Sequence, residues 1–136
     1  MQIRKEKGFT LIEIMIVVAI VAILAAVAYP SYLDSIRAAR RADAMDALLT
    51  LQNLQEKYRA NNTTFGTLAE VGGSAASLDG FYTLAVSGNT ATAYTLTATA
   101  VSGTSQAADT GCTAPTLTVS AANPRGVKAP AACWKN

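Results

Sequence analysis

The sequence predicts an α+β protein in which one long N-terminal helix packs on an antiparallel sheet of three or four strands. Three observations support this class: an apolar run over residues 9–29, an amphipathic pattern of helical period over residues 43–59, and short segments rich in β-branched and aromatic residues after residue 80. With 136 residues, the chain has room for one compact domain and one additional element. We therefore expect a small head that carries a separate apolar helix.

Residues 9–29 are long enough to cross a membrane as a helix. At about 1.5 Å per residue the run spans roughly 31 Å, which matches the hydrocarbon thickness of a bilayer. Arg4, Lys5 and Lys7 precede it, as in an export signal. However, the run is too long for the apolar region of an ordinary signal peptide, and no small-residue cleavage site follows it. We therefore expect a membrane-spanning segment.

The charges of the sequence do not indicate a generally basic protein. The formal net charge is +2, and the first eight residues account for all of it, because Arg4, Lys5 and Lys7 outnumber Glu6. The remainder is neutral overall and gives no general argument for nucleic-acid binding. The sequence has no His, and it shows neither a metal-ligand motif nor paired acids. We therefore expect no enzyme activity, no cofactor and no metal site.

Cys112 and Cys133 lie in loop-rich sequence near the C-terminus. Two cysteines behind an export-like N-terminus are typical of a disulfide formed outside the cytoplasm, whereas two free thiols would fit a cytosolic chain. Flanking positive charges do not decide the orientation of the apolar segment, because Arg37, Arg40 and Arg41 follow it. The cysteines favour a head in an oxidising compartment and an N-terminus in the cytoplasm.

Glu13 places a carboxylate inside the apolar run, where a plain membrane anchor has no need of one. An acid at the centre of a membrane helix costs at least about 2.5 kcal/mol, so it usually has a cationic partner. The alternative is that Glu13 lies at the headgroup boundary and its carboxylate reaches water. A free α-amine is protonated at neutral pH and would be a suitable partner if the mature chain began near Glu13.

The segment KGFTLIE, residues 7–13, followed by an apolar run and AYPSY, resembles the class III leader of type IV pilins. The resemblance implies that a prepilin peptidase removes residues 1–8 by cutting between Gly8 and Phe9, and that the new terminus at Phe9 is N-methylated. The amine formed there would lie one helical turn from Glu13. We expect an incoming subunit to offer this amine to Glu13 of a docked subunit, so that the ion pair sets the register of assembly rather than adding stability.

The long helix is expected to continue beyond the apolar run. Pro30 removes one backbone hydrogen bond and should bend the helix there. Ala22 stands where many type IV pilins have Gly, which makes local unwinding less favourable. Residues 43–59 then follow a 3.6-residue period. The face expected to be buried comprises Ala44, Ala47, Leu48, Leu51, Leu54 and Tyr58, and the opposite polar face comprises Asp43, Asp46, Thr50, Asn53 and Lys57.

A connecting loop and a sheet should complete the head. Residues 61–80 lack a periodic pattern and end in Gly- and Ser-rich sequence, so they predict a loop. A turn at Gly88-Asn89 separates the first two strand-like segments. The expected strands are FYTLAVS at 81–87, AYTLTATA at 93–100, PTLTVS at 115–120 and a fourth that begins with GVK at 126–128.

The resemblance to type IV pilins extends over nearly the whole chain. In that family the long helix packs on an antiparallel sheet and a disulfide closes the C-terminal region, which implies the pilin fold and a bond between Cys112 and Cys133. The segments GFYTL, AYTLTATA, DTGCTAPTLTV, GVK and CW are most similar to PilE-type minor pilins of Gram-negative bacteria. The organisation expected is a leader at 1–8, a transmembrane or filament-core helix at 9–30 and a head at 31–136, the head comprising a helix at 31–60, a loop at 61–80 and the sheet and disulfide region at 81–136.

The resemblance implies a structural function. The precursor would wait in the inner membrane as a single-pass protein with its head in the periplasm. It would then leave lipid for an extracellular helical filament that serves adhesion, twitching motility or DNA uptake. The partners implied are other pilin subunits, the prepilin peptidase, a membrane assembly platform and, indirectly, motor ATPases. One alternative is a type II secretion pseudopilin, although those commonly have a calcium-binding loop that this sequence lacks.

A second alternative is a minor pilin at the filament tip that binds DNA or a host surface. Arg37, Arg40 and Arg41 form one basic cluster, for which the simpler interpretation is local ion pairing with Asp34 and Asp43. A C-terminal group would combine stacking with phosphate contacts, unless its Trp simply packs against the disulfide. The candidate nucleic-acid contacts in this group are Arg125, Lys128, Trp134 and Lys135.

Overall fold

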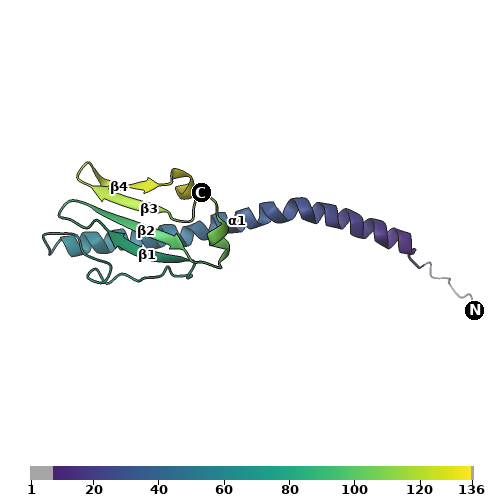
Figure 1. Ribbon diagram of the computed structural model, residues 1–136, viewed down its shortest axis with the longest axis horizontal. Helices are drawn as coiled ribbons and strands as arrows, with labels where there is room; N and C mark the ends of the chain where they lie inside the picture. Colours follow the sequence, from purple (N-terminus) through teal and green to yellow (C-terminus); the bar gives the residue numbers. More distant parts are fainter. Residues whose placement is uncertain (1–7, 136) are drawn as a thin grey trace, which may run out of the picture. The chain divides into compact units, whose positions relative to one another are not determined.

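The computed structural model describes residues 8–135 (Figure 1). Their Cα positions form two compact units, one that ends at Ser35 and one that begins at Ile36. The first is helical, and the second contains the rest of the helix and the whole sheet. Most of the expected leader, residues 1–7, lies outside the described residues.

Helix α1 extends from Leu11 to Arg59 and remains helical through Pro30. The hydroxyl of Thr10 accepts a hydrogen bond from the backbone N–H of Glu13 at 3.3 Å, which satisfies one of the unpaired amides at the helix start. Among the described residues, α1 is the one helix long and apolar enough to cross a membrane, with a mean hydropathy of 3.0 over its most apolar 18 residues. A bend at Pro30 stays a prediction.

The sheet has four antiparallel strands, in the order in which they occur in the sequence (Figure 1). This agrees with the predicted α+β class, and all four expected segments lie in strands, although the fourth strand begins at Asn123 rather than at Gly126 as expected. The strands are β1 from Tyr82 to Ser87, β2 from Tyr94 to Ala100, β3 from Thr116 to Ser120 and β4 from Asn123 to Ala129. Because neighbours in sequence pair directly, β1 and β4 form the two opposite edges of the sheet.

One face of the sheet packs on the amphipathic part of α1 and forms the core. The strands alternate between buried and more exposed residues, as expected for a sheet with one covered face. Of the helix stripe predicted to be buried, Ala44, Leu48 and Leu51 are fully buried and the other three residues are partly buried against the core. The largest buried strand residues are Tyr82, Leu84, Tyr94, Leu96, Leu117 and Val119.

Asp43 corrects the predicted polar face. It is only 9% exposed, and its carboxylate accepts hydrogen bonds from the hydroxyl of Ser77 at 2.6 Å and the backbone N–H of Asp79 at 3.1 Å. The expected pairing of Arg40 with Asp43 is also wrong, because the Arg40 guanidinium contacts the Ser105 hydroxyl instead. The sequence pattern could not show these partners, since they come from loops distant in the sequence.

Gln55 is a second buried polar residue of α1, and it binds the loop after the helix. Its amide N–H donates to the carbonyl of Gly66 at 2.7 Å, and its amide oxygen accepts from the N–H of Gly66 at 2.9 Å. Both residues are buried. Gln55 therefore satisfies both backbone polar groups of a loop residue that has no strand partner.

Two buried tyrosines have raised phenol pKa values. Burial, supplemented by the nearby charge of Glu56, raises the pKa of Tyr94 well above its ordinary value, and the Tyr94 hydroxyl donates to the Glu56 carboxylate at 3.3 Å. Burial also raises the pKa of Tyr82, whose hydroxyl accepts a hydrogen bond from the amide of Gln106 at 2.8 Å. In the folded head, burial therefore favours the protonated form of both phenols.

Strand β4 contains an irregularity at Gly126. Pairing with β3 shifts between Thr118 and Ser120, so β4 bulges at this point. Gly126 has a φ of +84°, and a Cβ there would approach the side chain of Leu117 to 2.8 Å. Only glycine meets both requirements without strain. This bulge was not predicted from the sequence. Two short 3₁₀ helices, η1 from Ser105 to Ala108 and η2 from Ala131 to Trp134, were not predicted either.

Candidate functional site

The arginines of α1 are used to hold the head together. The side chains of Arg37 and Arg40 donate to the carbonyl and the hydroxyl of Ser105, at the start of η1. The Arg40 guanidinium also lies 4.4 Å from the centre of the Phe81 ring. The side chains of Arg37 and Arg40 are therefore bound to the segment between β2 and β3, which makes them poor candidates for contacts with a ligand.

Arg41 makes the strongest of these contacts. Its guanidinium donates to both carboxylate oxygens of Asp109, at 2.7 and 2.6 Å. The Asp109 side chain is only 5% exposed, whereas that of Arg41 is 22% exposed. Two parallel hydrogen bonds to a nearly buried carboxylate fix the orientation of both groups. The pair locks the turn before Cys112 onto the helix.

Arg59 is committed in the same way at the end of α1. It donates to the backbone carbonyls of Asn62 and Ala91. Its guanidinium also lies 5.9 Å from the centre of the Phe65 ring. Arg59 therefore joins the helix end to the connection between β1 and β2.

The C-terminal basic group lies on a different part of the head. Arg125 and Lys128 belong to β4, the last strand of the sheet, and Lys135 directly follows η2. All three residues are exposed. Within the described residues, the side chains of Arg125 and Lys135 make no hydrogen bond or ion pair, although the Arg125 carbonyl accepts one from Gln52 at 3.3 Å. We call Arg125, Lys128 and Lys135 the basic edge.

Trp134 supports the basic edge rather than offering a free ring. It is half-buried against the hydrophobic core, and the ammonium group of Lys128 lies 4.8 Å from the centre of its ring. Cation–π contact at this distance favours one position for the Lys128 side chain. The indole N–H is enclosed and has no partner among the described residues. The expectation that Trp134 packs near the disulfide fits this arrangement better than base stacking does.

The predicted disulfide between Cys112 and Cys133 is present. Both residues are buried, and their Cα atoms are 5.5 Å apart. The bond connects the turn held by Asp109 to η2, which carries Trp134. The ion pair of Arg41 with Asp109 and the adjacent disulfide together therefore hold the C-terminal segment against the head.

Acidic residues are absent from the sequence around the basic edge. Asp109 is the last Asp or Glu in the chain, so residues 110–136 contain only basic ionisable side chains apart from the bonded cysteines. Close spacing of cations without intervening acids gives a positive local potential even though residues 9–136 as a whole are neutral. This edge is the part of the described surface best suited to bind phosphate groups.

The second candidate site is the N-terminal part of α1. Every residue from Gly8 to Tyr32 is exposed, including Phe9 and Glu13. Glu13 lies in the first turn of the helix, where a negative charge is favourable. The side chains around it are otherwise apolar and stand open on the helix surface, as in a segment that is covered by lipid or by other helices.

The buried acids of the head are engaged within it. No group of three or more His, Cys, Asp or Glu residues close enough to bind a metal ion occurs in the described part of the chain. The acids that are buried there, Asp43 and Asp109, are both engaged by hydrogen bonds within the head. The observed arrangement suits surface binding and assembly.

Comparison with known families gives two matches. A family model described as "Type IV minor pilin ComP, DNA uptake sequence receptor" matches residues 30–118. A second model, "Prokaryotic N-terminal methylation motif", matches residues 3–29. No curated protein matches the chain. The first match covers more than half of the sequence but ends before the basic edge.

Proposed function

We propose a function for this chain, which belongs to the ComP family of type IV minor pilins. It is a type IV pilus subunit involved in DNA uptake. Its family consists of structural pilins rather than enzymes. Within that role, we assign contact with duplex DNA to the basic edge of the head. The family match and the disulfide both favour a pilin over a type II secretion pseudopilin.

The precursor is processed at the boundary between Gly8 and Phe9. A prepilin peptidase cuts this bond and the new terminus at Phe9 is methylated, as the match to the methylation motif supports. Before assembly, the apolar part of α1 spans the inner membrane and the head lies in the periplasm. The disulfide supports this orientation, because such bonds persist in oxidising compartments.

Assembly exchanges lipid contacts for contacts between helices. Apolar helices slide easily past one another, because one axial position buries about as much surface as the next. The carboxylate of Glu13 removes this freedom if the amine of Phe9 in a neighbouring subunit pairs with it. Other pilin subunits are therefore the main partners, and the membrane assembly platform and motor ATPases supply the work.

The basic edge binds the phosphate backbone of DNA. Arg125, Lys128 and Lys135 are exposed cations on one edge of the sheet, and Trp134 and the disulfide restrict how far this edge can move. Such contacts position a protein on DNA and release counterions, which makes binding depend on salt. The single observation that carries the assignment is that these cations are exposed and free of acidic neighbours in sequence, whereas all four arginines of α1 are engaged within the head.

Binding of the full-length protein to DNA in detergent tests this assignment. We would measure fluorescence anisotropy of a short labelled duplex over a range of salt concentrations, for the wild type and for a variant with Arg125, Lys128 and Lys135 all changed to Ala. Each phosphate contact contributes about 0.9 to the slope of log K against log salt concentration, so the triple variant should lose about 2.7 from the magnitude of the slope.

Lys57→Ala is the matched control. Lys57 is also exposed but lies near the end of α1, beside Glu70 rather than on β4. We expect its salt slope to stay close to that of the wild type. An unchanged slope in the triple variant would overturn the assignment of DNA contact to the basic edge.

A further inference from the structure

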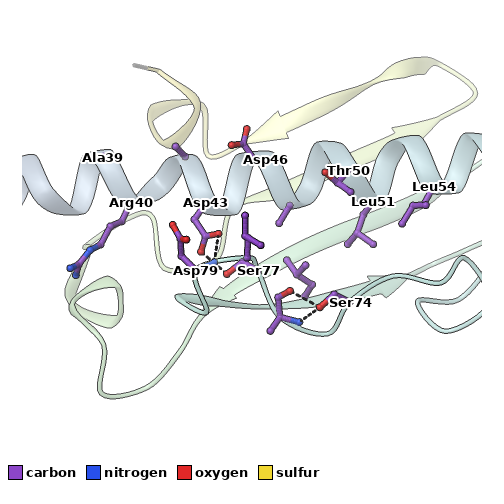
Figure 2. Close-up of a pocket in the computed structure, with 15 residues that line it drawn as sticks. Ala39, Arg40, Asp43, Asp46, Thr50, Leu51, Leu54, Ser74, Ser77 and Asp79 are labelled. Carbon is purple, nitrogen blue, oxygen red and sulfur yellow. Dashed lines mark hydrogen bonds between the residues drawn. The ribbon is translucent and has the colours of Figure 1, made fainter.

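The groove beside α1 is a poor surface for DNA. It runs between α1 and the loop before β1 and has a volume of about 760 Å³ (Figure 2). Asp46 and Asp79 are exposed at this groove, and the buried carboxylate of Asp43 is bound to the loop (Figure 2). Arg40 is the one basic residue of the lining, and its guanidinium is already engaged within the head. Acids without a free cation repel phosphate, so contacts with bases have to come from another part of the head.

Arg125 differs from the other arginines in the part of the chain that the structure describes. The four arginines of α1 are engaged within the head. Arg125 is exposed, and its guanidinium makes no hydrogen bond, ion pair or ring contact with any described residue. A guanidinium carries five N–H donors in a fixed planar fork. Arg125 therefore has an unused group that can make a directional contact with a ligand.

The backbone that carries Arg125 is fixed although the side chain is free. The Arg125 carbonyl accepts a hydrogen bond from the side chain of Gln52 on α1 at 3.3 Å. The next residue, Gly126, has a φ of +84° and lies so close to the side chain of Leu117 that a Cβ would approach it to 2.8 Å. Contacts on both sides of the Arg125 Cα therefore set the point from which its side chain extends. A side chain on a fixed backbone loses less conformational freedom when it binds.

Arg125 lies in the bulge of the hairpin that β3 and β4 form at the edge of the sheet. In this bulge, residues 124–126 of β4 stand opposite Val119 of β3. Bulges occur often beside functional sites, where they change the direction of a side chain. The turn of the hairpin contains Ala121 and Ala122, which are small, uncharged and exposed. The turn therefore leaves Arg125 accessible to a large partner.

The two lysines of the basic edge suit a different contact. The ammonium group of Lys128 is held 4.8 Å from the centre of the Trp134 ring, and Lys135 follows η2, which the disulfide holds. An ammonium group is a compact charge without the planar fork of a guanidinium. It therefore contacts phosphate groups, which are the same in every sequence. Such contacts place the protein on the duplex but do not distinguish one sequence from another.

We propose that Arg125 recognises a guanine in the major groove of DNA, while Lys128 and Lys135 contact the flanking phosphates. The major groove admits a two-stranded β-ribbon, and the donors of an arginine pair with O6 and N7 of guanine. The inference rests on the proposed function, because it requires that the basic edge contacts DNA. It goes further by dividing the basic edge into one residue that determines sequence specificity and two that position the duplex.

Selection from a library of random duplexes supplies the probe for the test. The full-length wild type in detergent would be used to enrich duplexes, and the most enriched duplex would be labelled for fluorescence anisotropy. Each G·C pair would then be replaced by A·T, one at a time. We expect one of these replacements to lower the affinity of the wild type at least about fivefold, as loss of a bidentate contact to guanine should. Deazaguanine at the same position, which lacks only the N7 acceptor, should also lower the affinity.

Arg125→Lys is the decisive variant, because it keeps the charge and removes the planar fork. It should bind the selected duplex and the duplex with the replaced pair with nearly equal affinity. Lys128→Ala is the matched control. It should weaken binding to both duplexes by the same factor and keep the preference of the wild type for guanine. Both positions are exposed, so neither change should unfold the head.

Two results would overturn the recognition of guanine by Arg125. One is a preference for guanine in Arg125→Lys that equals that of the wild type, and the other is a wild type that enriches no sequence from the library. The salt slope of the triple variant separates this inference from the proposed function. If the triple variant loses slope while Arg125→Lys keeps its preference, DNA contact at the basic edge stands and base recognition falls alone. If the triple variant keeps the slope of the wild type, the DNA assignment falls and base recognition falls with it.

Discussion

Replacing Gln55 by Leu should unfold the head at a much lower temperature. The substitution removes both hydrogen bonds to Gly66, and because this glycine is buried, its N–H and C=O have no access to water in the folded state. A buried polar group left without a partner costs about 1–3 kcal/mol, so the two groups cost roughly 2–6 kcal/mol. The apolar Leu side chain offsets part of this cost, and we expect a net loss of about 3 kcal/mol.

For a domain of this size, a loss of about 3 kcal/mol lowers the midpoint of thermal unfolding by roughly 12–24 °C. Near-UV circular dichroism of the full-length protein in detergent would follow the head, since its aromatic residues lie mainly outside the apolar helix. Asn53→Leu, an exposed change two residues away, should leave the midpoint nearly unchanged. A loss below about 1 kcal/mol in Gln55→Leu would refute the reasoning, because it would mean that water or another group already satisfies Gly66.

Two further predictions concern the assembly segment and the buried phenols. Glu13→Val should give a processed, membrane-inserted protein whose incorporation into filaments falls about tenfold, equivalent to about 1.4 kcal/mol in docking free energy, and immunoblots of sheared filaments would measure it. Normal incorporation of this variant would show that Glu13 does not set the register of assembly. Because folding raises the phenol pKa values of Tyr94 and Tyr82, the stability they contribute is complete below the ordinary tyrosine pKa of about 10 and is lost as pH rises above it. Denaturant unfolding measured as a function of pH should show this loss of stability, and the loss should be smaller in Tyr94→Phe. If both proteins lost the same stability at alkaline pH, the raised pKa of Tyr94 would not be its cause.

Most of the fold could be predicted from the sequence because its signals are local. Strand β2 alternates residues at a period of two, and the helix stripe with Leu48 and Leu51 follows a period of 3.6. The disulfide followed from the presence of two cysteines behind an export-like segment. These features depend on neighbours in the sequence, so they could be inferred without the tertiary structure.

The polar contacts within the head could not be predicted in the same way. Asp43 and Gln55 are polar residues of the kind usually found at exposed positions of a helix. Only the folded loop brings their partners, Ser77 and Gly66, close to them. The arginines of α1 gave an apparent basic cluster, but their partners lie at Ser105 and beyond, far away in the sequence. The residues of the basic edge could be identified as candidates from the sequence, because they are basic. The contact of the Lys128 ammonium group with the Trp134 ring could be seen only in the structure.

Intact-mass spectrometry of the protein recovered from purified filaments tests the central claim of a processed pilus subunit most directly. The account predicts a chain that begins at N-methylated Phe9 and carries the Cys112–Cys133 disulfide. Filaments that contain the chain with residues 1–8 still attached would contradict it, because Glu13 would then have no adjacent terminal amine to set the register of assembly.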